Sequence, residues 1–109
     1  MAYDAAIADA MQADLGLLPG LSEKKMFGGI CFLLDGNMVC AVHGGGAMYR
    51  VGKDRVAEAL ALGAQPMMMG TRVMGGWADL DPGAFQDGAL RAALTGMALA
   101  HAATLPPKG

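Results

Sequence analysis

The chain has 109 residues, of which 54% are hydrophobic and only 17% are charged, and its formal net charge is -2 at pH 7. This length predicts a single domain, residues 1–109, with one core, and the apolar composition excludes an intrinsically disordered chain. The negative net charge disfavours direct binding to nucleic acid, which usually needs clustered Lys and Arg, and no apolar run approaches the ~20 residues that a membrane-spanning helix needs.

The first predicted element is an amphipathic helix. Hydrophobic side chains recur at helical spacing over residues 7–18, and polar side chains occupy the other faces. Asp4 is a candidate N-cap, because its carboxylate can accept hydrogen bonds from the free amides of the first turn. The helical pattern ends at Gly16 or at Pro19-Gly20.

An antiparallel meander of strands is predicted next. Residues 30–34 and 38–43 are short apolar runs that flank a Gly36-Asn37 turn, and this arrangement is typical of a hairpin. A glycine triplet then forms a second turn before a third strand at residues 47–51. Turns this short exclude a parallel crossover. At residues 24–27 an extra short strand is an alternative to a loop.

The second half of the chain predicts two further helices and a weaker hairpin. Residues 53–62 predict a short helix that Gly63 closes, and residues 66–69 and 77–80 predict two more strands. A last helix runs from about residue 86 to residue 103. We therefore predict a two-layer α+β fold in the order α-β-β-β-α-β-β-α, with an antiparallel sheet of about five strands and flanking helices.

Cys31, Cys40 and His43 come nearest to a thiol or metal site, because thiolate and imidazole are the ligands that zinc prefers. With a two-residue Gly36-Asn37 turn, the two cysteines would share a sheet face and His43 would point the other way. With a three-residue turn, the cysteines would lie on opposite faces. The only other histidine is His101, on the last helix. We therefore interpret the cysteines as core thiols and predict no metal, no cofactor and no catalytic residue.

The two cysteines also bear on the compartment. They are too few for a disulfide framework and agree with a reducing environment. The amino terminus lacks the cationic start of an export signal. Both observations predict a cytoplasmic protein.

The glycine-rich segment at residues 46–54 is superficially similar to a phosphate-binding loop. Five residues rather than four separate Gly46 from Gly52, and Asp54 stands where such a loop has Ser or Thr for magnesium. We interpret the segment as a strand followed by a helix start.

A candidate interaction surface combines basic and aromatic side chains. Lys24 and Lys25 precede Met26 and Phe27, and Trp77 follows a glycine pair later in the chain. Large aromatic and cationic side chains are common anchors of macromolecular contacts. The alternative is that the Met-Phe-Gly-Gly stretch turns a strand tightly, since glycines supply backbone freedom in either case.

Several motifs, read together, resemble the N-terminal domain of the TfoX/Sxy family. They are Leu18-Pro19-Gly20, the run from Glu23 to Gly29, Gly36-Asn37-Met38, Val42-His43, Arg50-Val51-Gly52, Gly76-Trp77 and the tail from Leu105 to Lys108. The resemblance covers essentially the whole chain and is most specific at residues 24–29. It implies a fold similar to that of type III secretion chaperones, and a role among regulators of natural competence that act as transcriptional coactivators rather than as enzymes. Full-length members carry a second, C-terminal domain, so the resemblance is to a stand-alone version.

From these observations we expect a non-enzymatic protein-interaction or regulatory module. Its expected partners are a protein, such as the transcription machinery, and a second copy of the chain, through apolar helices or a sheet edge. The alternatives are a thiol- or metal-dependent enzyme that uses Cys31 or Cys40 with a histidine, and a domain that binds a small ligand between sheet and helices.

Overall fold

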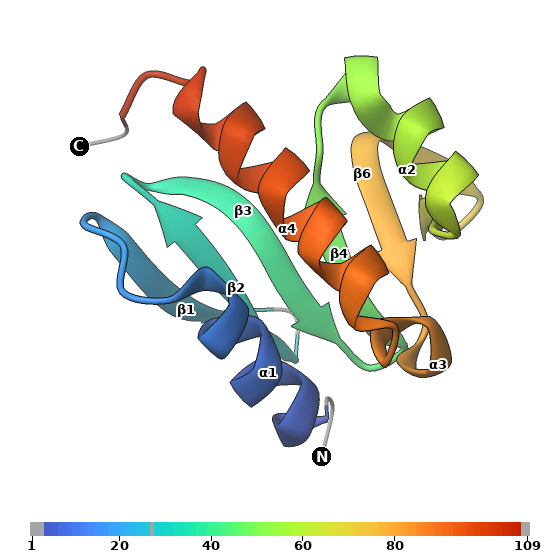
Figure 1. Ribbon diagram of the computed structural model, residues 1–109, viewed down its shortest axis with the longest axis horizontal. Helices are drawn as coiled ribbons and strands as arrows, with labels where there is room; N and C mark the ends of the chain where they lie inside the picture. The colour runs from blue at the N-terminus through green and yellow to red at the C-terminus, as the bar shows by residue number, and fades with distance from the viewer. Residues whose placement is uncertain (1–3, 27, 108–109) are drawn as a thin grey trace.

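One antiparallel sheet of six strands forms the centre of the domain, and the helices lie against one of its faces (Figure 1). The computed structural model describes residues 4–26 and 28–107. The strand order across the sheet is β1-β2-β3-β4-β6-β5, so β1 and β5 are its edges. In chain order the elements are α1 (Ala5–Leu15), β1 (Leu21–Met26), β2 (Gly29–Leu34), β3 (Asn37–His43), β4 (Gly46–Arg50), the 3₁₀ helix η1 (Lys53–Arg55), α2 (Val56–Leu62), β5 (Gln65–Met69), β6 (Arg72–Leu80), α3 (Pro82–Phe85) and α4 (Gly88–Ala103).

The predicted α+β fold is confirmed, with one strand more than the five expected. The additional strand is β1, which pairs with β2 from Leu21↔Leu34 to Met26↔Gly29. The extra short strand that residues 24–27 suggested is therefore real but begins earlier, at Leu21. Its exposed Ser, Glu and Lys side chains are typical of an edge strand, where polar residues prevent further pairing, and they weaken the apolar signal that marks a strand.

The first helix follows its predicted capping chemistry. The Asp4 carboxylate accepts a hydrogen bond of 2.8 Å from the Ala6 amide, as an N-cap does. The helix ends at Leu15, because Gly16 adopts a positive φ of 70° that an L side chain rarely takes. Leu18, which shared the apolar spacing, lies beyond the helix.

The last predicted helix, from about residue 86 to residue 103, is α4, and a separate short helix, α3, precedes it. Asp81 caps the short helix α3 by accepting a hydrogen bond from the Ala84 amide. Asp87 then caps α4 by accepting from the amides of Ala89 and Leu90. No helix in the described part of the chain has both the length and the apolar run that crossing a bilayer requires.

The core lies between the helices and the face of the sheet that they cover. Its largest fully buried side chains include Tyr49, Phe85, Met11, Leu80 and Leu94, contributed by β4, α3, α1, β6 and α4. An ion pair of 2.6 Å between Arg91 and Asp14 joins α4 to α1 above this core. The core therefore lies on one face of the sheet, and none of the described helices covers the other face.

Candidate interaction surface

The two cysteines lie on opposite faces of the sheet. The turn residues are Asp35 and Gly36, and a bulge in the β2–β3 ladder shifts the register so that Cys40 pairs with Phe32 and Cys31 with Ala41. Without that extra residue, the same turn would set the two cysteines directly opposite each other. The shared-face arrangement expected for a two-residue turn is therefore wrong, because the turn comes earlier and the bulge reverses the facing of the side chains that follow it.

Burial keeps both thiols protonated. Cys31 and Cys40 have no measurable exposed surface. Loss of hydration on burial raises the pKa of Cys31 to about 11, and the nearby Lys24 ammonium offsets this only in part. Burial raises the pKa of Cys40 still further. Since the thiolate is the nucleophile, burial lowers the reactivity of both thiols at neutral pH.

His43 does not act as a base for either cysteine. Its Nδ1 accepts a hydrogen bond of 3.0 Å from the Gly45 amide, and its Nε2 lies 2.6 Å from Asp79 Oδ1. This network assigns the ring proton to Nε2, which donates to the carboxylate. Both ring nitrogens are thus engaged. Among residues 4–26 and 28–107, no three Cys, His, Asp or Glu side chains gather as a metal site.

The His43–Asp79 hydrogen bond joins β3 to β6 across the intervening strand β4. We expect a double-mutant cycle with His43→Ala and Asp79→Ala to give a coupling energy of about 1 kcal/mol, since the pair is half-buried and short. Urea denaturation of the four proteins at pH 7 measures it. Strictly additive losses would show that the bond contributes nothing to stability.

The structure separates the residues that the sequence grouped as a contact surface. Lys24 and Lys25 are exposed on the edge strand β1. Met26 ends β1, but its side chain and all of Phe27 lie outside the described residues. Trp77 is only 9% exposed and lies on β6, well across the sheet from β1. The two lysines and Trp77 do not form one local cluster.

The sheet face without helices carries a continuous row of side chains that we call the open face. Cross-strand partners share a face, and the register Lys24↔Cys31, Cys31↔Ala41, Ala41↔Met48 extends from the edge to the centre of the sheet. Met38 pairs with Leu33 on the same face, and Trp77 pairs with Arg50. We define the open face by Lys24, Cys31, Met38, Ala41, Met48, Arg50 and Trp77.

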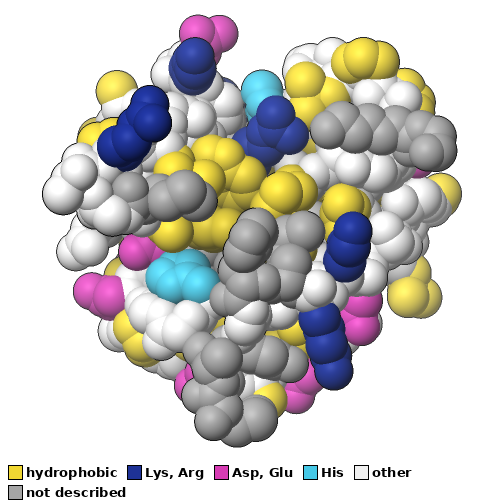
Figure 2. All heavy atoms as spheres, turned by 180° about the vertical axis from the view of Figure 1, so that it is seen from behind, with side chains coloured by type: hydrophobic (Ala, Val, Ile, Leu, Met, Phe, Trp, Pro, Cys, Tyr) yellow, Lys and Arg dark blue, Asp and Glu magenta, His cyan; other side chains and the backbone are white. Residues whose placement is uncertain are grey.

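The open face has an apolar centre, with Lys24 and Arg50 at its sides and Asp79, the cross-strand partner of Met48, beside that centre. Met38 and Met48 are half-buried and line a shallow hollow together with Cys31, Ala41 and His43. Figure 2, which views the molecule from behind, shows hydrophobic side chains gathered on this face beside a histidine, with Lys and Arg side chains around them. Met38 and Met48 form the accessible part of this centre, because Cys31, Ala41 and Trp77 are at most 9% exposed. Methionines at a surface can adapt their shape to a protein partner.

Sequence reasoning missed Met38 and Met48 as partly exposed residues of this face. Alternation in a strand shows that two faces exist but does not show which one the helices cover, and methionines and alanines look like core on either face. The usable signal was Arg50, two residues after Met48, because a charged side chain near a strand end indicates the solvent side.

Comparison with known families finds one match. Residues 13–102 match the model of the TfoX N-terminal domain. Comparison with curated proteins and with solved structures gave no match.

Proposed function

Because the chain belongs to the TfoX N-terminal domain family, we propose that it is a non-enzymatic interaction module that regulates natural competence as a coactivator of transcription. The family is associated with the control of DNA uptake. The coactivator role, the partner and the surface that binds it are parts of this proposal.

The observation that carries the proposal is the open face. Its centre offers half-buried methionines, which adapt their shape to different partners, beside the aromatic ring of Trp77. Lys24 at one side and Arg50 at the other are cations. A protein surface with an apolar centre and acidic groups at its rim complements this arrangement.

A protein partner fits the charge distribution better than DNA does. The chain has a net charge of -2, and the described cations are spread over several elements instead of forming one basic stripe. Arg91 is neutralised by Asp14 and Arg55 by Glu58. We therefore propose that the module reaches promoters through a bound protein and not by gripping the phosphate backbone.

Self-association is a second part of the proposal. The edges of the sheet, β1 and β5, each pair with only one strand, and α4 presents the small residues Ala92, Gly96 and Ala100 to solvent. Either surface can join two copies about a twofold axis. Sedimentation velocity over a range of concentrations tests this, and a single monomer boundary at all concentrations would contradict it.

The experiment that tests the function uses a matched pair of methionines. In a naturally transformable bacterium that carries this gene, deletion should reduce transcription of DNA-uptake genes, and the wild-type chain should restore it. Met48→Glu should fail to restore it, because a carboxylate in the apolar centre of an interface must be desolvated without a partner. Met68→Glu is the control, since Met68 is 45% exposed on β5 at the far edge of the sheet.

Two outcomes would count against the proposal. If deletion of the gene leaves transcription of the uptake genes unchanged, the competence role is wrong. If both glutamate variants restore transcription equally while remaining folded, the open face is not the contact surface.

A further inference from the structure

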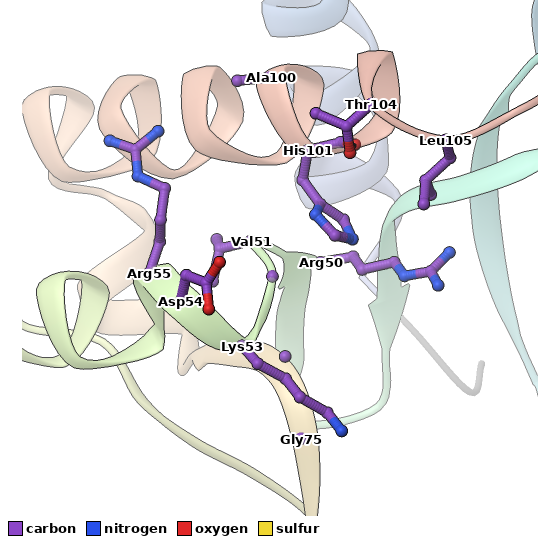
Figure 3. A pocket seen from close by; sticks show the side chains of 12 residues that line it. Arg50, Val51, Lys53, Asp54, Arg55, Gly75, Ala100, His101, Thr104 and Leu105 are labelled. Carbon is purple, nitrogen blue, oxygen red and sulfur yellow. The ribbon is translucent and has the colours of Figure 1, made fainter.

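A cavity of about 600 Å³ lies apart from the centre of the open face, between the β4–α2 connection and the last turn of α4. The connection contributes residues 50–55, the bulged part of β6 contributes Gly75 and Gly76, and the end of α4 contributes Ala100, His101 and the residues just after it. Figure 3 shows the His101 ring pointing from α4 toward the loop that carries Val51 and Lys53. A cavity of this size suits a small organic ligand.

The lining of this cavity is positive although the whole chain is negative. Arg50, Lys53 and Arg55 line it, against a single carboxylate, Asp54. Arg55 forms an ion pair with Glu58 at 3.0 Å. Arg50 and Lys53 are therefore the lining cations that form no ion pair with the described residues. Walls of low dielectric around a group of cations concentrate the field in the cavity and attract an anion.

His101 adds a polar group that the fold itself does not use. No group in residues 4–26 or 28–107 makes a hydrogen bond to either ring nitrogen of His101. The imidazole is nevertheless half-buried and lines the cavity. A positioned imidazole with both nitrogens free can donate a hydrogen bond to an oxyanion.

Two glycines, Gly52 and Gly75, let neighbouring groups of this site approach the backbone closely. A Cβ on Gly52 would lie 2.7 Å from His101 Nδ1, and Gly52 has a φ of 92°, so only glycine lets the ring rest on the backbone there. The Gly52 amide donates to the Gly76 carbonyl at 3.0 Å, which ties the loop to β6. The Lys53 stem crosses Gly75, where a Cβ would meet Lys53 Cε at 3.3 Å. The loop and the imidazole are thus placed before any ligand arrives, and Lys53 is exposed at the edge of the cavity.

We propose that this cavity binds a small organic phosphate, whose phosphoryl oxygens contact Lys53, Arg50 and His101. A doubly charged group suits the two cations Arg50 and Lys53 of the β4–α2 connection, with the His101 imidazole of α4 lining the same cavity. Ala100 and the half-buried Leu105 give the organic part of the ligand an apolar wall. The site shares Arg50 with the open face, whereas Lys53 and His101 lie outside it.

Titration of the isotope-labelled full chain with adenosine 5'-monophosphate, followed by NMR, tests the site. The amides of Gly52, Gly76 and His101 should shift and saturate, and adenosine alone should shift them far less. Inorganic phosphate should perturb the same amides with weaker affinity. Adenosine binding as tightly as its monophosphate, or no saturable shift at these amides, would overturn the proposal. Citrate binding as tightly as the monophosphate would overturn the assignment to phosphate.

Matched variants locate the binding. Lys53→Gln and His101→Gln should each raise the dissociation constant by about tenfold, as expected for loss of one charged or polar contact to an oxyanion. Lys25→Gln, on the exposed edge strand β1, is the control and should leave it unchanged. Arg50 is left unaltered because it also belongs to the open face. Equal weakening by all three variants would show non-specific attraction and sink the proposal, and unshifted amides elsewhere show that each variant is folded.

Discussion

Replacing Gly29 by alanine should lower the free energy of unfolding by on the order of 2–4 kcal/mol, a large part of what a domain of this size has. A Cβ at Gly29 would lie 1.9 Å from the Val42 carbonyl oxygen and 3.1 Å from its carbon. Both are backbone atoms of β3, so no flexible side chain can yield. The β2–β3 ladder must open to accept the methyl group, and the adjoining Ile30↔Val42 pair opens with it. Urea denaturation of Gly29→Ala measures the loss.

Gly96→Ala is the matched control for this substitution. Gly96 lies in α4 and is exposed, and a methyl group on its Cα would meet no atom within 4 Å outside the backbone of its own helix. Alanine has the higher helix propensity, so this variant should gain up to about 1 kcal/mol. If the urea midpoint of Gly29→Ala equalled that of wild type, the close approach of Gly29 to the Val42 carbonyl would be absent. The predicted loss favours a structural role for the Gly28-Gly29 part of the family-like motif, where Gly28 also has a positive φ of 74°.

Local chemistry explains how far the fold could be predicted from the sequence. Asp4 and the Asp35-Gly36 turn region act over a few residues, so the first helix and the first hairpin could be placed to within a few residues. The strand β1 and the short helix α3 were harder to predict. β1 is an edge strand with exposed polar side chains, and Asp81 and Asp87 each cap a helix within one short segment.

The candidate sites depended on contacts that no local pattern contains. The bulge near Phe32 decides which cysteine faces the helices, and nothing in the apolar run signals it. Predicting the open face required the register of several strands. The proposed phosphate site combines Lys53, Gly76 and His101, which lie far apart in the chain and line one cavity only in the fold. The exposure of Lys24 and Lys25 was predictable, because charged side chains in a short strand indicate an edge.

The buried thiols should make the protein lose stability in alkali. Burial raises the pKa of Cys31 from 9.0 to about 11, and it raises the pKa of Cys40 and of Tyr49 as well. A group whose pKa is higher in the folded state than in the unfolded state stabilises the fold fully below its unfolded pKa. That contribution is lost as the pH rises from about 9 toward 11, because only the unfolded chain can then release the proton. For Cys31 alone, the loss by pH 11 is about 2 kcal/mol.

Urea midpoints at pH 7, 9 and 10.5 for wild type, Cys31→Ala and Cys40→Ala measure this loss. Between pH 7 and pH 10.5, the urea midpoint of each alanine variant should fall less than that of wild type, whatever its value at pH 7. The Lys and Tyr side chains titrate alike in all three proteins, so they do not cause this difference. The native thiols should also react slowly with a disulfide reagent at neutral pH, since a buried protonated thiol is a poor nucleophile. A rapid reaction of either cysteine in the folded protein, with no difference between the alkaline declines, would mean that a thiolate is accessible. That result would return the thiol-dependent enzyme to first place among the functions this fold could serve.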